Sequence, residues 1–379
     1  MESRAKADRA AMTAPAFRLL MTVDAVGGVW RYAMDLAQGL KRHGFHSVFA
    51  GLGPQPSPAQ RAEAERVGAL RWFEEPLDWM AEREAELDPL PSALARLVRE
   101  ERIDIVHLNL PSQAYGLAVD VPVVAASHSC VPTWFKAVRG ENCPAPWDWQ
   151  VKRNRSGLAR ADAALAPSGS HARLVEGVYG PIRNLSVAFN AALPPPGAPA
   201  ARREPFVLAA GRWWDEGKNG AVLDEAAPWT AWPVHMAGAL HGPNGQRMRL
   251  RHAEALGELA SGQARALMAR AGIFVSPSVY EPFGLAALEA ALSGAPLVLA
   301  DIPTYRELWD GAALFAAPRD PQSFAAAINR LAEDEGLRSR MSELAQERAQ
   351  RYSPENQIDA VLAAYRAAGL RAADRLLVA

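Results

Sequence analysis

Residues 17–51 read FRLLMTVDAVGGVWRYAMDLAQGLKRHGFHSVFAG and contain one complete unit of an α/β fold. Phe17–Val23 is a short apolar run typical of a buried strand, and Asp24–Gly28 contains two glycines typical of a tight turn. The spacing of apolar residues predicts a helix over Val29–His43 and a second strand over His46–Gly51. A strand, a crossover helix and a second strand form the βαβ unit of parallel sheets.

Short apolar runs alternate with amphipathic stretches along the rest of the chain, which predicts an α/β fold with doubly wound parallel sheets. Further strands are expected at Ala69–Phe73, Ile103–Leu108, Pro122–Ser127, Ala163–Ala166, Leu185–Phe189, Phe206–Gly211, Pro233–Ala237, Ile273–Ser276, Leu297–Ala300 and Ala313–Phe315. The chain is expected to end in three helices, at Pro321–Asp334, Gly336–Arg351 and Pro354 to about Arg375.

A proline-rich run divides the chain. Residues 193–204 read LPPPGAPAARRE, and so many prolines prevent a helix or a central strand. We expect a linker here, between an N-terminal domain over residues 1–192 and a C-terminal domain over residues 193–353. Ligands of open parallel sheets bind beyond the carboxyl ends of the strands, so the expected site lies in the cleft between the domains.

Composition excludes several classes of protein. The 379 residues include 41 basic and 42 acidic side chains, and this balance argues against nucleic-acid binding, which requires a basic excess. Cys130 and Cys143 are too few for a disulfide scaffold, so we expect free thiols in a reducing compartment. The uncharged stretch 226–246 contains prolines and histidines and cannot span a membrane, and residues 1–14 lack a secretory signal. We therefore expect a cytoplasmic protein.

The most informative segment is residues 276–300, SPSVYEPFGLAALEAALSGAPLVLA. A helix is expected to begin near Gly284, and its free N–H groups and partial positive charge suit a phosphate or a hydroxyl-rich ligand. Glu281 precedes that helix, and Glu289 follows eight residues later among alanines. A carboxylate on such a face is costly unless it meets a donor, for example a ligand hydroxyl. The alternative is that Glu289 is solvated and Glu281 caps the helix.

Three other segments place polar or flexible residues at the ends of expected strands. Arg212 and Lys218 bracket the loop in AAGRWWDEGKN and could bind one diphosphate, although they could also be ordinary surface charges. Gly27 and Gly28 would let the backbone approach a ligand, or could form only a tight turn. His128 ends another strand, where an isolated histidine can be either structural or functional.

A basic segment that contains tryptophans follows His128. Trp134, Trp147 and Trp149 could stack on a sugar acceptor, and the basic side chains between residues 134 and 160 could attract a phosphorylated acceptor or an anionic membrane surface. The alternative is a solvated basic helix whose tryptophans pack against the sheet.

The frame EPFGLAALE, from Glu281 to Glu289, and the GAP that follows the helix resemble glycosyltransferase family 4. These are retaining nucleotide-sugar transferases of the GT-B fold, with two Rossmann-like domains facing each other across a cleft. The resemblance implies that Glu281 contacts hydroxyls of the transferred sugar and that Glu289 binds the ribose. It places the backbone amides of Phe283, Gly284 and Leu285 near the sugar and the phosphate.

The resemblance extends to the other segments. It implies that Arg212 and Lys218 bind the donor diphosphate, that Gly27 and Gly28 meet the donor across the cleft, and that His128 contacts the donor sugar. It also implies that residues 354–379 cross back and complete the first domain.

Three positions depart from the family pattern. Asn219 stands where the family commonly has glycine, Trp213 and Trp214 are inserted, and Phe189-Asn190-Ala191 replaces the usual Asn-Gly.

The expected activity is transfer of a hexosyl group from a UDP or GDP type of sugar to an acceptor hydroxyl on a glycan, a glycolipid or a small molecule. No Asp-x-Asp tripeptide or Cys/His cluster is present, so neither a metal nor another cofactor is expected. A lipid-linked acceptor would allow peripheral contact with the inner face of a membrane. The alternatives are a GT-B-fold epimerase, a sugar phosphorylase, or a non-catalytic protein that binds sugar nucleotides or glycans.

Overall fold

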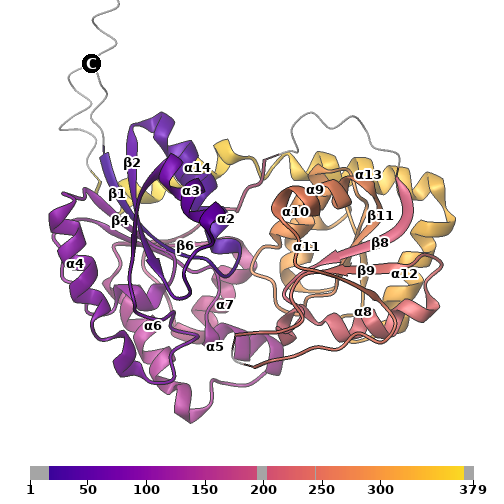
Figure 1. Cartoon of the computed structure of the whole chain (residues 1–379), viewed down its shortest axis with the longest axis horizontal. Coiled ribbons are helices and arrows are strands. Elements are labelled where there is room, and N and C mark those ends of the chain that lie inside the picture. The colour runs from indigo at the N-terminus through magenta and orange to yellow at the C-terminus, as the bar shows by residue number, and fades with distance from the viewer. Residues whose placement is uncertain (1–16, 194–202, 244, 371–379) are drawn as a thin grey trace, which may run out of the picture.

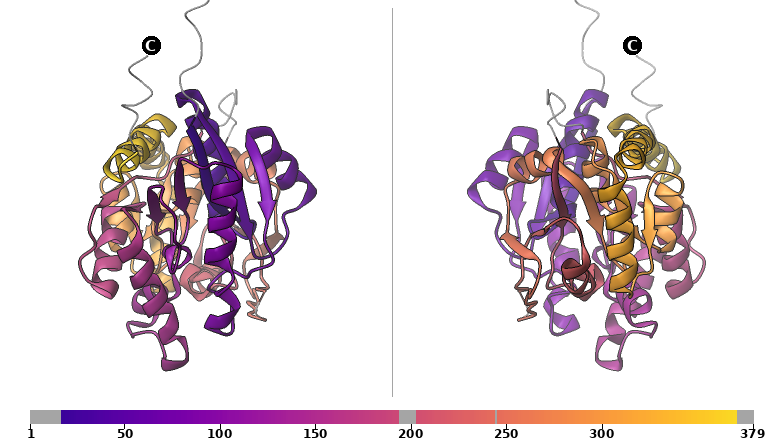
Figure 2. Two further views of the ribbon diagram at one scale, coloured as in Figure 1. Left: turned by 90° about the vertical axis from the view of Figure 1, so that its left-hand side faces the viewer. Right: turned by 90° about the vertical axis from the view of Figure 1, so that its right-hand side faces the viewer.

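The computed structural model describes residues 17–193, 203–243 and 245–370. Two α/β domains lie side by side, each with helices on both faces of a parallel sheet (Figures 1 and 2). Most of the predicted linker, residues 194–202, lies outside the described residues, so the predicted boundary between residues 192 and 193 stays a prediction.

The first sheet has the order β3-β2-β1-β4-β5-β6-β7, and every neighbouring pair is parallel. Its strands are β1 (Phe17–Asp24), β2 (Phe45–Leu52), β3 (Gly68–Trp72), β4 (Ile105–Leu108), β5 (Val123–Ala126), β6 (Ala163–Ala166) and β7 (Leu185–Val187). Each expected strand of the first domain is present, with its ends moved by no more than a few residues.

The second sheet has the order β10-β9-β8-β11-β12-β13 and is also parallel. Its strands are β8 (Glu204–Ala210), β9 (Val234–Ala237), β10 (Glu254–Gly257), β11 (Ala271–Ser276), β12 (Leu297–Ala300) and β13 (Leu314–Ala316). The sequence did not indicate β10, because this edge strand is mostly exposed and has no apolar run.

The helices of the two domains pack on the sheets. They are α2 (Gly28–Leu40), α3 (Pro58–Val67), α4 (Leu90–Glu100), α5 (Val131–Trp134), α6 (Asp148–Arg160), α7 (Gly169–Tyr179), α8 (Gly220–Ala226), α9 (Ser261–Arg270), α10 (Leu285–Leu292), α11 (Pro303–Trp309), α12 (Pro321–Glu333), α13 (Glu335–Ala349) and α14 (Pro354–Ala367). The helix expected over Val29–His43 is divided: α2 ends at Leu40, and a 3₁₀ turn over Lys41–His43 follows.

The final helix α14 packs on α2 and β6 of the first domain, as its yellow ribbon beside the indigo lobe in Figure 1 shows. Val361 and Tyr365 are fully buried in the core of that domain. The Tyr365 hydroxyl lies 2.9 Å from Nδ1 of the buried His107, and Tyr32 Oη lies 3.3 Å from its Nε2. His107 is therefore a core residue that connects α14 to the sheet. The helix ends at Ala367 rather than near Arg375, and residues 371–379 of the segment predicted to complete the first domain lie outside the described residues.

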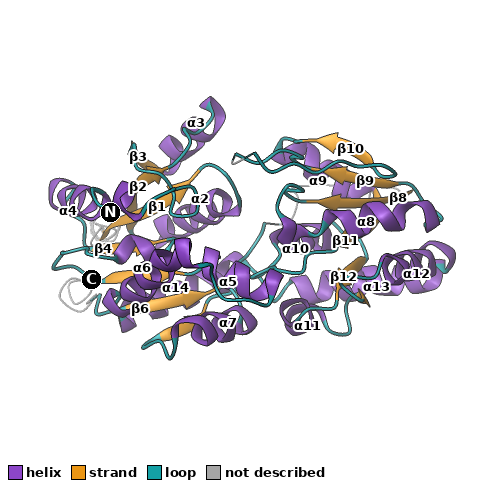
Figure 3. Ribbon diagram, turned by 90° about the horizontal axis from the view of Figure 1, so that it is seen from below, coloured by secondary structure: helices purple, strands orange, loops and turns teal. Residues whose placement is uncertain are grey.

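The domains meet where α5 and α7 face α10 and α11 (Figure 3). Thr133 Oγ1 lies 2.8 Å from Tyr280 Oη, and the Trp134 indole donates to Asp215 Oδ1 at 2.9 Å. Both contacts bring the segment after β5 against loops at the carboxyl ends of β8 and β11. The carboxyl edges of the two sheets therefore face one another.

Three histidines make the stability of this fold depend on pH. Burial lowers the pKa of His107 and of His171, each to about 3, and that of His128 to about 4, from the ordinary value of 6.5. Below about pH 6.5 the unfolded chain binds protons that the folded chain does not bind until near pH 4 or below. The free energy of unfolding therefore falls as the pH is lowered through this window, by at most about 1.4 kcal/mol per pH unit for each histidine.

We expect urea unfolding to show this loss between about pH 6.5 and about pH 4.5, and we expect His171→Gln to reduce it. The matched control is His46→Gln, which changes an exposed histidine and should keep the full loss. An acid-induced loss in His171→Gln equal to that of the unchanged protein would contradict this account.

Candidate active site

Lys218 and Glu281 form an ion pair at the carboxyl edge of the second sheet. Lys218 follows β8 and Glu281 follows the neighbouring strand β11, so the order of the strands brings their loops together. Lys218 Nζ lies 2.5 Å from Glu281 Oε2, and both side chains are mostly buried. The Val279 N–H donates to Gly217 O at 2.9 Å and fixes one loop against the other. Glu281 therefore does not cap α10, which was one of the alternatives from the sequence.

The N-terminus of α10 lies next to this ion pair. Gly284 precedes the helix with φ of 95°, and no side chain caps the helix. A Cβ atom at Gly284 would lie 2.8 Å from the Tyr305 ring, so both the backbone angle and the space require glycine. Phe283 is buried against Tyr352, and Leu285 begins the helix. The first N–H groups of α10 are thus held beside Glu281 and can donate to an anionic or hydroxylated ligand.

Gly27 and Gly28, in the turn after β1, lie directly opposite this part of the second domain. A Cβ atom at Gly27 would lie 3.1 Å from Arg212 Nη1, and one at Gly28 would lie 3.6 Å from Leu285 Cδ1. Asp24 Oδ1 accepts the Val26 N–H at 2.9 Å and stabilises the turn that carries both glycines. The structure therefore brings together the Gly-Gly turn, Arg212 and the start of α10.

Asn219 explains one departure from the family pattern. Its backbone adopts the left-handed conformation, with φ of 53°, which asparagine tolerates better than most residues. Its side-chain amide donates to Pro277 O at 3.0 Å and to Pro318 O at 2.6 Å. Asn219 thus provides the turn that glycine would give and also connects the Lys218 loop to two neighbouring segments.

The two inserted tryptophans have different environments. Trp213 is buried, and its indole donates to Ala237 O at 2.9 Å. The guanidinium of Arg212 lies 5.4 Å from the centre of the Trp214 ring, within the range of a cation–π contact, and 3.6 Å from Asp215. Trp213 therefore anchors the loop, whereas Trp214 and Asp215 contact the cation predicted to bind the diphosphate.

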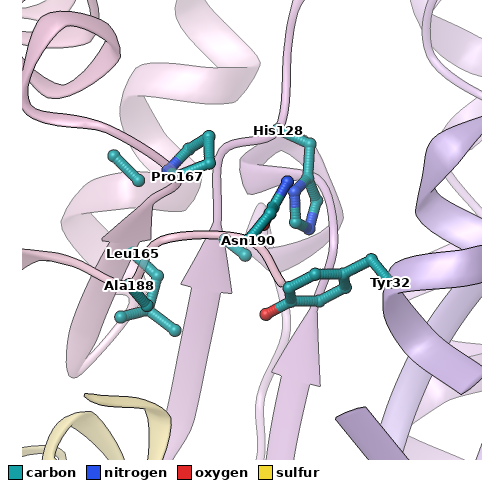
Figure 4. Close-up of a pocket in the computed structure, with 8 residues that line it drawn as sticks. Tyr32, His128, Leu165, Pro167, Ala188 and Asn190 are labelled. Atoms are coloured by element: carbon teal, nitrogen blue, oxygen red, sulfur yellow. The ribbon is translucent and has the colours of Figure 1, made fainter. Parts of the chain in front are cut away.

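His128 lines a small pocket on the first-domain side, together with Tyr32 and Asn190 (Figure 4). Burial lowers the pKa of His128 to about 4, so the ring is neutral near pH 7. His128 Nε2 donates to Asn109 Oδ1 at 2.9 Å, because the Asn109 amide is fixed by its own bond to Thr22 O. Nδ1 is then the unprotonated nitrogen and can accept a hydrogen bond from a hydroxyl group.

Sequence reasoning missed the partners of His128. Tyr32 packs edge-on against the His128 ring at 4.3 Å between centroids. Asn190 is buried, and its Oδ1 has no hydrogen-bond partner among the described residues. The sequence indicated Asn190 only through the replacement of the family's Asn-Gly by Asn190-Ala191. Tyr32, in the middle of α2, gave no signal of its own.

Glu289 lies on α10 and faces charged residues of both domains. Burial raises its pKa, and the charges of Arg265 and Arg31 partly oppose that effect. Arg31 and Asp35 belong to α2 and form their own ion pair at 2.6 Å. Glu289 is therefore neither fully solvated nor paired as Glu281 is, and its predicted role at the ribose stays a prediction.

The three tryptophans predicted at the acceptor have separate positions. Trp134 is at the domain interface and donates to Asp215, whereas Trp147 precedes α6 and Trp149 lies in its first turn. Several charges of this segment are neutralised locally: Arg139 pairs with Glu216, Arg153 is buried near Glu84 and Asp88, and Arg160 lies near Asp162. Less positive charge is left for an anionic acceptor than the sequence suggests, and the acceptor role of the tryptophans stays a prediction.

Among the residues that the structure describes, no three His, Cys, Asp or Glu side chains are arranged to hold a metal ion. None of the described helices is long and apolar enough to cross a membrane. Cys130 and Cys143 are both buried free thiols.

The chain is similar in sequence to known glycosyltransferases. The family model for Glycosyltransferase Family 4 matches residues 26–191, and the model for Glycosyl transferases group 1 matches residues 246–348. A glycogen synthase of Mycobacterium tuberculosis is 27% identical over 365 residues, which cover 85% of this chain and 86% of that protein.

Solved structures show the same fold. Sucrose-phosphate synthase of Thermosynechococcus elongatus superposes with a TM-score of 0.76 at 17% identity, over 93% of this chain and 98% of that one. Anabaena HepE, solved in complex with UDP and glucose, superposes with a TM-score of 0.72 at 19% identity, over 92% of this chain and 98% of that one.

These matches favour a transferase over the epimerase and the non-catalytic protein, and the fold predicted from the sequence is confirmed. The two family models match one domain each and together include Gly27, Gly28, His128, Glu281 and Glu289. The chain belongs to the family 4 type of glycosyltransferase and has the GT-B fold.

Proposed function

We propose that this enzyme moves a hexosyl group from a nucleoside-diphosphate sugar to an acceptor hydroxyl, with retention of the anomeric configuration and without a metal ion. The observation that carries the proposal is the convergence of Arg212, Lys218 and Glu281 beside the N-terminus of α10, opposite the turn of Gly27 and Gly28. Two cations and free N–H groups suit a diphosphate, and the carboxylate suits sugar hydroxyls.

The leaving group determines what these residues must do. When the bond between the anomeric carbon and the diphosphate oxygen breaks, negative charge grows on the nucleoside diphosphate. Arg212, Lys218 and the N–H groups of α10 stabilise that charge, which is the role that a divalent cation has in other transferases. Glu281, already fixed by Lys218, accepts hydrogen bonds from the sugar and holds it in place.

Retention follows from attack on the same face as the leaving group. The acceptor oxygen forms its bond to the anomeric carbon, and the acceptor proton passes to a phosphate oxygen of the departing diphosphate. No carboxylate nucleophile is required in this scheme. His128 is neutral near pH 7 and can accept a hydrogen bond from a sugar hydroxyl through Nδ1.

A UDP-sugar is the favoured donor, because the similar fold of HepE was solved with UDP and glucose. A thermal-shift panel of UDP-glucose, GDP-mannose and ADP-glucose tests the donor class. NMR of the product then tests the stereochemistry, because the one-bond coupling between the anomeric carbon and its proton distinguishes the two anomers for glucosyl and mannosyl products alike. No shift with any of these nucleotides, or a product of inverted configuration, would refute the proposal.

We expect Glu281→Gln to lower the turnover number by roughly 100-fold, because the amide cannot provide a charged acceptor to the sugar.

We expect Lys218→Ala to raise the Kd for UDP by roughly tenfold, which is the effect of losing one charge-assisted hydrogen bond to the diphosphate. Steady-state kinetics and calorimetry measure the two effects. The control is Glu225→Gln, an exposed change in the same domain. Normal turnover in Glu281→Gln would remove this residue from the site.

Metal removal provides a separate prediction. We expect transfer to continue within about twofold of its rate after incubation with EDTA and gel filtration, because protein groups neutralise the leaving diphosphate. Adding Mg²⁺ or Mn²⁺ should not restore or increase the rate. A large loss of activity that Mn²⁺ reverses would contradict the metal-independent mechanism and would leave the transferase assignment intact.

A further inference from the structure

A carboxylate of the second domain caps a helix of the first. Glu307, on α11, accepts the backbone N–H groups of Gly169 and Ser170 at 2.7 and 2.5 Å. It also accepts the Ser170 hydroxyl at 2.6 Å, and Arg173 Nη2 lies 3.5 Å away. Gly169 and Ser170 begin α7. The contact therefore joins α11 to the start of a helix that lies more than 130 positions earlier in the sequence.

The chemistry of this contact makes it strong. The first turn of a helix has free N–H groups and a partial positive charge, and a carboxylate satisfies both. The Glu307 side chain is only 23% exposed, so water screens the interaction less than at an open surface. By contrast, Arg139 and Glu216 form an ion pair across the domains in which both side chains are about half exposed, and pairs of this kind contribute little.

The same turn of α7 is connected to both walls of the candidate active site. Ser168, which precedes α7, donates its hydroxyl to Pro282 O at 2.7 Å, and Pro282 directly follows Glu281. His171, one turn along, has Nε2 at 3.1 Å from Ser127 Oγ, and Ser127 directly precedes His128. A shift of α7 relative to α11 would therefore move Glu281 relative to His128.

We propose that Glu307 is a positioning residue, whose contact with the first turn of α7 holds the two domains in the closed arrangement that catalysis requires. Glu307 is not expected to touch either substrate. The inference rests on the transferase activity alone. It does not depend on the identity of the donor, on the anomeric configuration of the product or on whether a metal ion is required. Loss of the contact should favour an open arrangement and leave each domain folded, because neither sheet contains these bonds.

The test is small-angle X-ray scattering of the full chain without ligand. We expect Glu307→Gln and Glu307→Ala to increase the radius of gyration, with unchanged far-UV circular dichroism. The matched control is Glu347→Gln, which changes an exposed carboxylate on α13 and should scatter as the unchanged protein does. Superimposable scattering curves for Glu307→Ala and the unchanged protein would overturn the proposal, whatever the donor proves to be.

Binding and turnover separate a positioning role from a purely structural one. We expect the Kd for the nucleoside diphosphate of whichever donor the thermal-shift panel identifies to stay within about twofold, because Arg212 and Lys218 are in the second domain, while the turnover number falls by about tenfold. An equal loss of nucleotide binding and turnover would show that Glu307 supports the folding of its own domain instead, and would also overturn the proposal.

A double-mutant cycle tests the contact itself. Ser170→Ala removes the hydroxyl that Glu307 accepts, so its effect on turnover should be small and should largely disappear in the Glu307→Gln background. Fully additive effects would show that the two residues act independently, which contradicts the proposed contact.

Discussion

The ion pair between Lys218 and Glu281 is the interaction on which the candidate site depends. It joins the loops that follow β8 and β11, and the bond from Val279 to Gly217 and the amide of Asn219 fix the same two loops. A mostly buried charge pair of this kind is stable only when its geometry is maintained, so the surrounding loops must be rigid. The helix α10 begins at Leu285, four residues after Glu281, and its position follows from that of the pair.

The site also requires that no large side chains fill the space where the two domains face each other. Gly27 and Gly28 lie so near Arg212 and Leu285 that side chains at either glycine would reduce the space between the domains. The site is thus assembled from two halves, and the contacts of α5 and α7 with the second domain decide how the halves are placed. A site of this kind excludes water only while those contacts are maintained.

Three tryptophans near the candidate site have structural contacts. Trp213 anchors a loop to β9, Trp134 connects the domains through Asp215, and Trp214 lies against Arg212. Each therefore acts on the position of the loop that carries Arg212 and Lys218, through hydrogen bonds of the indole or through the face of the ring. The basic segment that accompanies Trp134 is similarly engaged in local ion pairs, which composition alone could not indicate.

The sequence by itself determined the order of strands and helices, the two α/β domains and the segments that carry Gly27, Arg212, Lys218, Glu281 and Glu289. It could do so because apolar periodicity and short motifs are local properties. The edge strand β10 lacked that local signal. Only the tertiary structure decided that Lys218 pairs with Glu281, that Asn109, Tyr32 and Asn190 surround His128, and that Glu307 caps α7. These contacts join residues far apart in the chain. The order of the strands within each sheet and the contact between the two domains, rather than any local preference, bring them together.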